Sequence, residues 1–209
     1  MKRMMLALAM TFALPLTAGA ETYTLDPAHT EIGFTAKHMM VTNVHGKFDK
    51  FDGTVEWDEK NPAKSSMTIN IDPASIDTGN AQRDTHLKSP DFFDVAKYPT
   101  MSFKSTKVKK AGAGWNVTGE LTMHGVTKPV TLKVEGPTKP EKTPFGTTVR
   151  AAHAAGELNR KDFGLNWNKA LEAGGVLVGD TIKLNIDTEL VQKPAAAKNE
   201  AKQEAKPAK

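Results

Sequence analysis

Apolar and polar residues alternate with a period of two along much of the chain between residues 21 and 192. Residues of one parity are apolar in stretches such as Ile32, Phe34 and Ala36; Met67, Ile69 and Ile71; Val130, Leu132 and Val134; and Ile182, Leu184 and Ile186. Successive side chains of a β-strand point to opposite faces, so this pattern is typical of antiparallel strands with one buried face. The sequence therefore predicts an all-β fold.

Turn residues divide the alternating region into about eight strands. His124-Gly125 lies between two alternating stretches, as a two-residue hairpin loop does. An open sheet of this size leaves two unpaired edges, and closure removes them. We predict an eight-stranded antiparallel barrel, whose interior is filled by side chains or holds one small ligand. Trp115, Val117, Leu121 and Met123 repeat the alternation, which Gly119 interrupts, and further strand candidates are residues 45–58, 100–109 and the alanine-rich 146–157.

Residues 79–94 interrupt the alternation and read as a short helix followed by a turn. Their polar start and apolar end predict a short helical segment that covers the mouth of the barrel. Within it, Asp91 is expected to cap or charge a helix start. Arg83 is expected to pair with Asp84 or Asp94 in a structural role.

The chain begins with the pattern of a secretory signal peptide. Lys2 and Arg3 precede an apolar run, and Ala18-Gly19-Ala20 forms a small-residue cleavage site. The run is shorter than the roughly 20 residues that a membrane-spanning helix needs. We predict cleavage after Ala20 and export to the periplasm.

Two further parts are predicted after the signal peptide: a single barrel domain over residues 21–192 and a tail over residues 193–209. The tail is rich in Lys and Ala and contains no aromatic or β-branched residue. Such a segment cannot bury enough apolar surface to offset its ordering entropy, so it is predicted to be disordered and dispensable for folding.

Charge and cysteine content exclude several functions. Residues 21–192 carry 21 basic and 22 acidic side chains, so the predicted barrel lacks the positive surface that nucleic-acid binding needs. The chain contains no Cys, which excludes disulfides, thiol chemistry and Cys-ligated metals. The barrel must be held by its core.

The sequence shows no motif of a catalytic or cofactor site. There is no nucleophile elbow, no P-loop and no dinucleotide fingerprint. The six His residues lack the close spacing of a helical zinc motif. We therefore expect no catalytic residue, no cofactor and no metal ion, although a metal site assembled from distant strands stays open.

Aromatic and Met side chains are the candidates for a binding cavity, because Met suits adaptable apolar surfaces. Inward parity on the strands and proximity to the mouth select the ligand-binding candidates Phe34, Ala36, His38, Met39, Phe48, Ile69, Leu87, Phe93, Phe103, Leu121 and Trp167. The alternative for each of them is a plain core role.

An ordered series of short motifs resembles the YceI-like family, the polyisoprenoid-binding proteins of the bacterial envelope. The motifs include Asp26-Pro27-Ala28-His29-Thr30, Gly46-Lys47-Phe48, Phe51-Asp52-Gly53, Arg83-Asp84-Thr85-His86-Leu87-Lys88-Ser89, Asp91-Phe92-Phe93-Asp94, Gly119-Glu120-Leu121-Thr122-Met123-His124-Gly125 and Arg160-Lys161-Asp162-Phe163-Gly164. Together with the motifs between them they cover nearly all of residues 22–191.

The resemblance implies a lipocalin-like barrel with a long apolar cavity for an isoprenoid lipid, a quinone or another long-chain amphiphile. We expect a periplasmic binding or carrier protein that is not an enzyme. Transient membrane contact and a homodimer are compatible with this role. The alternatives are an envelope enzyme that modifies a lipid through a polar residue such as His38 or Arg83, and a stress-induced envelope protein without a ligand.

Overall fold

The computed structural model describes residues 19–172 and 174–194. Most of the predicted signal peptide and most of the predicted tail lie outside these residues, so both stay predictions. In the described part, no helix has the length and apolar character to cross a membrane.

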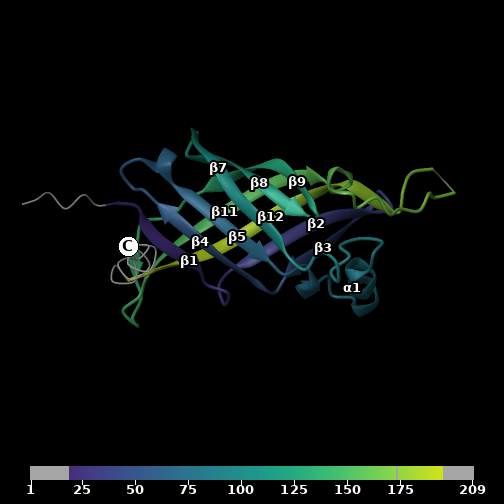
Figure 1. Ribbon diagram of the computed structural model, residues 1–209, viewed down its shortest axis with the longest axis horizontal. Coiled ribbons are helices and arrows are strands. Elements are labelled where there is room, and N and C mark those ends of the chain that lie inside the picture. The colour runs from purple at the N-terminus through teal and green to yellow at the C-terminus, as the bar shows by residue number, and fades with distance from the viewer. Residues whose placement is uncertain (1–18, 173, 195–209) are drawn as a thin grey trace, which may run out of the picture.

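The described residues form one antiparallel sheet of 12 strands and one short α-helix (Figure 1). The strands and the helix are β1 (Glu21–Leu25), β2 (Glu31–His38), β3 (Thr42–Phe48), β4 (Phe51–Trp57), β5 (Ser66–Ile71), β6 (Ile76–Asp77), α1 (Ala81–Lys88), β7 (Met101–Ala111), β8 (Gly114–Met123), β9 (Val126–Glu135), β10 (Glu141–Lys142), β11 (Thr148–Asn159) and β12 (Val178–Gln192). Three 3-10 turns add Pro62–Lys64, Pro73–Ser75 and Arg160–Phe163.

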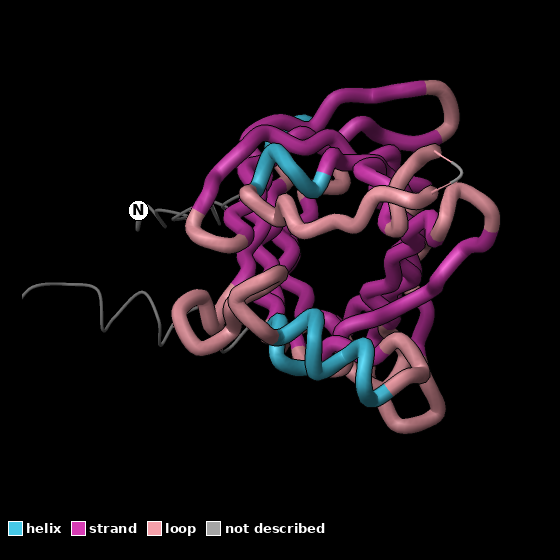
Figure 2. The backbone as a smooth tube through the Cα atoms, turned by 90° about the vertical axis from the view of Figure 1, so that its right-hand side faces the viewer, coloured by secondary structure: helices cyan, strands magenta, loops and turns pink. Residues whose placement is uncertain are grey.

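The sheet closes into the predicted barrel of eight strands. β1 and β2 act as one interrupted strand, because both pair with β12 on one side. On the other side, β1 pairs with β4 and β2 pairs with β3. At the next position around the ring, β5 pairs with β4 and the short β6 pairs with β3. β12 pairs with β11 along one edge and with β1 and β2 along the other, which completes the ring seen end-on in Figure 2. β10 adds a short pairing outside this ring.

The interior follows the parity of the sequence. On β9, Val130, Leu132 and Val134 are buried, and the residues between them are exposed. Gly119 interrupts the alternation of β8 because the ring of Phe103 on β7 occupies the space where a Cβ would stand. The Phe103 ring on β7 thus requires a glycine at position 119 of β8.

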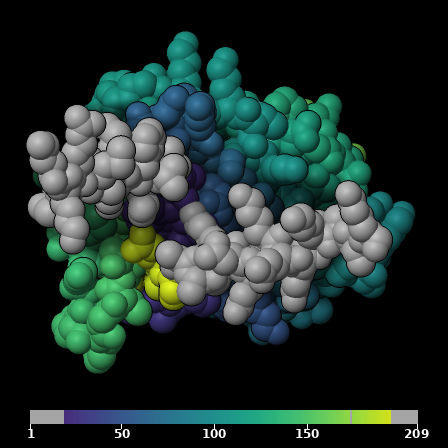
Figure 3. Space-filling model, turned by 60° about the vertical axis from the view of Figure 1, so that its left-hand side comes forward, coloured from purple at the N-terminus to yellow at the C-terminus, as the bar shows by residue number. Residues whose placement is uncertain are grey.

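The two ends of the barrel carry different connections. One end, on the right of Figure 1, carries α1, the segment that follows it and the loop between β11 and β12. We call it the lid end, and residues 78–98 the lid segment. The opposite end carries the β4–β5 and β9–β11 connections, and we call it the network end. Figure 3 brings the network end forward, where the green β9–β11 connection stands out from the body.

The helix was correctly predicted, but two details of the lid segment differ from the prediction. Asn80, not Asp91, caps the helix, and its side chain accepts from the Arg83 N–H. The chain turns after α1 without forming a second helix, and the Asp91 carboxylate instead forms a hydrogen bond with His86, whose Nε2 lies 2.8 Å from Asp91 Oδ2. Arg83 donates to the hydroxyl and carbonyl of Thr78, so its role is structural but its partner is not an Asp.

Candidate binding cavity and its two ends

The barrel encloses an apolar cavity of about 260 Å³ that extends from the lid end to the network end. Leu87 and Phe93 line it at the lid end, and Trp57 and Trp115 line it at the other. Between them, inward side chains of the long strands expose only apolar surface to the cavity. Met67, Met101 and Met123 are part of this wall, and such side chains adapt readily to different shapes.

The structure places eight of the eleven candidate ligand-binding residues on the cavity wall: Phe34, Ala36, Phe48, Ile69, Leu87, Phe93, Phe103 and Leu121. Period-two parity was sufficient to find those on strands. Contact of any of them with a ligand stays a prediction.

The other three candidates lie outside the wall. His38 is the last residue of β2, where β12 changes register beside it, so it sits at the rim. Met39 is 46% exposed in the turn that follows, with a φ of 51° that directs the chain back into β3. Trp167 packs behind the wall, with its ring 5.3 Å from that of Phe92.

The lid segment is joined to the barrel by ring contacts. The rings of Phe93 and Phe48 meet edge to face at 5.9 Å. Trp167 contacts both Phe92 and His86, and Tyr98 contacts His124 at 4.6 Å.

Hydrogen bonds within the lid segment are local. Those that the structure describes join its residues to one another or to Asp77, as in Thr78 to Asp84, Phe93 to Leu87 and Tyr98 to Asp94. The segment therefore can move from the barrel without leaving a buried polar group unpaired.

Arg160 fixes the neighbouring loop of the lid end. Its buried guanidinium donates to the carbonyls of Leu165, Trp167, Val178 and Gly179 and pairs with Asp180 at 3.2 Å. Burial lowers the pKa of Arg160 from its ordinary value, while Asp180 opposes this shift. With its donors directed at these acceptors, the guanidinium holds the loop that carries Trp167.

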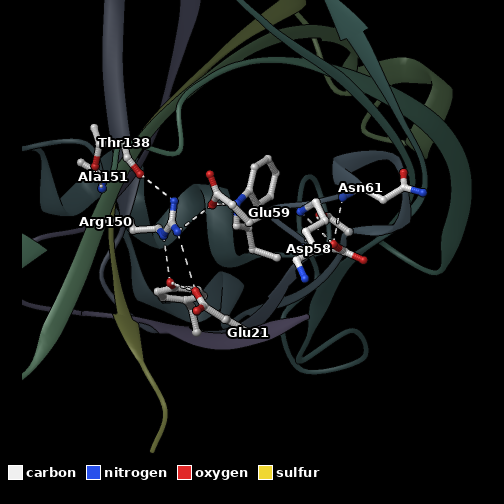
Figure 4. A network of polar contacts seen from close by, with 11 residues as sticks. Glu21, Asp58, Glu59, Asn61, Thr138, Arg150 and Ala151 are labelled. Atoms are coloured by element: carbon white, nitrogen blue, oxygen red, sulfur yellow. Dashed lines mark hydrogen bonds and ion pairs between the residues drawn. The ribbon is translucent and has the colours of Figure 1, made fainter. Parts of the chain in front are cut away.

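A second buried Arg closes the network end, where Figure 4 shows its partners. Arg150 is 4% exposed and donates to the Tyr23 hydroxyl at 2.8 Å, the Thr138 carbonyl at 2.9 Å and the Glu59 carboxylate at 2.7 Å. The Glu21 carboxylate lies 3.7 Å from the guanidinium and accepts from Tyr23 at 2.6 Å. This network joins β1, β11 and the β4–β5 and β9–β11 connections.

The electrostatics of the network favour its charged form. Burial acts to lower the pKa of Arg150, but its contacts with Tyr23 and Glu59 outweigh burial, and the pKa is raised. The indole N–H of Trp57, 2.8 Å from Glu59, and the Arg150 cation hold the pKa of Glu59 below its usual range. Among the described residues, no buried side-chain N or O atom lacks a hydrogen-bond partner.

Sequence reasoning did not identify either buried Arg as part of the cavity ends. Arg150 carried a signal, because it shares the parity of the inward-facing Ala152 and Ala154 on β11. A charged residue on the apolar face of a strand requires a buried partner. Its partners Tyr23 and Glu59 are distant in sequence, so the sequence alone does not show them.

The chain is similar to proteins of known family. The model of the YceI-like domain matches residues 23–190. Protein YceI of Escherichia coli O157:H7 is 41% identical over 164 residues, which cover 76% of this chain and 85% of that protein. A UPF0312 protein of Vibrio cholerae is 38% identical over 176 residues, covering 79% of this chain and 89% of that protein.

Solved structures show the same barrel. BcnA of Burkholderia cenocepacia superposes with a TM-score of 0.67 at 25% identity, covering 79% of this chain and 98% of that one. The YCEI protein of Campylobacter jejuni has a TM-score of 0.64 at 32% identity, with 82% and 98% covered. A polyisoprenoid binding domain from Saccharophagus degradans has a TM-score of 0.58 at 16% identity, with 82% and 98% covered, a likeness that shows the fold alone.

Proposed function

Because the chain belongs to the YceI-like family, we propose that it is a periplasmic binding or carrier protein for a long-chain isoprenoid lipid or quinone. The observation that carries the proposal is the cavity, which runs through the barrel and exposes only apolar surface. The polyisoprenoid binding of the Saccharophagus domain, which shares the fold, is consistent with it.

The energetics of such a carrier follow from apolar burial. Each methylene moved from water into the cavity contributes about 0.8 kcal/mol. A bilayer is an equally apolar destination, so transfer between membrane and barrel is close to balance. Such a protein can take up and release its ligand without a catalytic step.

The size of the cavity limits the ligand. Its volume of about 260 Å³ is at the small end of ligand pockets in general, which occupy roughly 300–1,000 Å³. A long isoprenoid chain therefore requires lining side chains to move apart, and the three Met residues of the wall permit this. Affinity measured across a series of prenol chain lengths will show how far the wall adapts.

The lid end is the proposed path of the ligand. The turn beside it presents three large apolar side chains to solvent: Met39, Met40 and Val41, which are 46%, 56% and 74% exposed. The Lys37 ammonium lies at the same turn, 3.3 Å from the Val41 carbonyl. This combination suits transient contact with a membrane surface, where apolar tips insert and cations meet anionic headgroups.

A role as an enzyme is not favoured by the polar residues near the cavity. His38 lies at the rim, and the guanidinium of Arg83 is bonded to Thr78 in the lid segment. Neither residue lines the cavity. We therefore propose binding without chemistry.

Solvent extraction of the protein from its native host, followed by mass spectrometry, tests the proposal. We expect a long-chain lipid or quinone, chemically unchanged after incubation with the protein. The absence of any such lipid, together with no binding of added quinone or prenol, would refute the proposal. Recovery of an altered lipid would instead support an enzyme.

Fluorescence locates the ligand. Tryptophan placed at Phe34 or Phe103, on the cavity wall, is expected to change emission when the ligand is added. Phe145→Trp provides the matched control, because Phe145 is 92% exposed outside the cavity. An equal response from all three variants would contradict a ligand in the barrel.

A further inference from the structure

Three potential metal ligands, two from one corner and a third that is distant in sequence, meet on the outside of the barrel. Asp26 and His29 lie in the corner between β1 and β2, and Glu189 lies on β12. The Nδ1 atom of His29 is 2.8 Å from Asp26 Oδ2 and 3.9 Å from Glu189 Oε1. All three ligand atoms lie within 4.8 Å of one another.

These distances fit a small divalent cation. Zinc bonds to His nitrogen and carboxylate oxygen are about 2.0–2.2 Å long, so tetrahedral ligand atoms are separated by roughly 3.4 Å. The separation of 2.8 Å between His29 and Asp26 is below that value, and the separation of 3.9 Å between His29 and Glu189 is above it. Small rotations of the side chains therefore bring the three atoms to bonding distance from one ion.

The backbone that carries the ligands is fixed by contacts outside the three side chains. The Asp26 N–H donates to the Glu189 carbonyl at 2.9 Å, which joins the corner to β12. The Thr30 hydroxyl lies 3.0 Å from that of Thr188 and 3.3 Å from the Glu189 nitrogen. The Ala28 N–H holds the second oxygen of Asp26 at 2.9 Å, as outer groups orient the ligands of metal sites.

The surroundings favour a cation and leave room for water. An open groove on the outer face is lined by His29 and Glu189 together with Glu135, His153 and Asp187. Its carboxylates create a negative field, and the imidazole of His29 is 66% exposed. Leu190, the next residue after Glu189, lines the apolar cavity instead.

We propose that Asp26, His29 and Glu189 bind a divalent cation of the zinc type, with water in the remaining positions. One imidazole nitrogen and two carboxylates are a ligand set suited to such ions. The cation replaces the proton that His29 Nδ1 shares with Asp26. It joins the β1–β2 corner to β12 and is separate from the ligand cavity.

Calorimetric titration of the untagged mature protein with Zn²⁺ tests this site. We expect one ion per chain, and Co²⁺ in its place is expected to give the intense visible absorption of low coordination number. His29→Ala is expected to abolish binding, and Glu189→Gln to weaken it by about tenfold or more. The thermal midpoint is expected to rise with Zn²⁺ in the parent protein and not in His29→Ala.

His86→Ala is the matched control, because His86 also lies 2.8 Å from an Asp but, among the described residues, belongs to no such group of three. It is expected to leave Zn²⁺ affinity unchanged. Absence of Zn²⁺ binding to the parent protein, or equal binding by the parent and His29→Ala, overturns the proposal. Lipid retention is expected to be unchanged in His29→Ala, so this test is independent of the proposed function.

Discussion

The two ends of the barrel are closed by different chemistry. At the network end, a buried guanidinium joins four segments through hydrogen bonds to Tyr23, Thr138 and Glu59. At the lid end, residues 78–98 rest on the barrel through ring contacts such as that between Phe93 and Phe48. The lid end also has a buried guanidinium, that of Arg160, but it holds the neighbouring loop and does not bond to the lid segment. Only the network closure itself depends on a buried charge.

The difference indicates which end opens. Moving Arg150 out of its network would leave buried donors and acceptors unpaired, at a cost of about 1–3 kcal/mol for each group. Moving the lid segment exposes apolar rings but keeps its local hydrogen bonds. We therefore expect the network end to stabilise the fold and the lid end to control the ligand.

Arg150→Met gives the largest expected effect on stability. The substitution keeps an unbranched side chain but removes the hydrogen bonds to Tyr23, Thr138 and Glu59. We expect the free energy of unfolding to fall by about 3 kcal/mol, because hydrogen bonds to charged groups contribute about 1.5–3 kcal/mol. Urea denaturation measures it, and a loss below about 1 kcal/mol would show that the network is not a structural closure.

Phe93→Ala sharpens the comparison at the other end. Its ring is half-buried, lines the cavity and contacts Phe48, so we expect a modest loss of stability and ligand release that is about tenfold faster. Stopped-flow transfer of a quinone to vesicles measures the release rate.

Phe51→Ala is the control for this variant, because Phe51 packs partly buried against the core without lining the cavity. It is expected to lose stability with an unchanged release rate. A loss of about 3–5 kcal/mol in Phe93→Ala with no change in release would identify Phe93 as a core residue.

Acid titration probes the network more gently. The folded-state pKa of Glu59 is lowered by Trp57 and Arg150, so Glu59 contributes stability above its unfolded pKa of about 4.3. This contribution is lost as the pH falls through the folded-state pKa. Because Glu59 is 65% exposed, the effect is small. The free energy of unfolding, measured from neutral pH into acid, is expected to fall less in Glu59→Gln than in the parent. Equal falls in the two proteins would contradict the role assigned to Glu59.

Removal of the tail gives the smallest expected effect. Truncation after Gln192 removes no strand residue, but it deletes the hydrogen bond from the Lys193 N–H to the Thr22 carbonyl at 2.8 Å. Truncation after Pro194 keeps this bond. We expect the second variant to melt as the full chain does and the first to melt slightly lower. A clear loss of stability or of lipid retention after Pro194 truncation would show that the tail contributes to the barrel.

The wall of the cavity and the helix at the lid end could be predicted from the sequence, and the network end could not. Period-two parity follows from strand geometry alone, which is why Phe34, Phe103 and Leu121 were placed correctly on the wall. Parity fails where a strand stops. His38 has the inward parity of β2 but lies at its last position, and Met39 belongs to the turn.

The closures and the outer cluster depend on contacts across the fold. Arg150 meets Tyr23 across 127 positions of the sequence, and Glu189 meets the corner of Asp26 and His29 only after the ring has closed. The sequence excluded a zinc motif of close spacing, which is a statement about helices and short loops. The sequence did not indicate that β12 brings Glu189 beside Asp26 and His29.

Parallel release rates of one quinone from Arg150→Met and Phe93→Ala test the central claim most directly. The claim is that the lid end controls the ligand while the network end maintains the fold. We expect Phe93→Ala to release the quinone about tenfold faster than the parent. We expect Arg150→Met, at a temperature where it is folded, to release the quinone at the parent rate despite its larger loss of stability. Fast release from Arg150→Met together with the parent rate from Phe93→Ala would contradict the account.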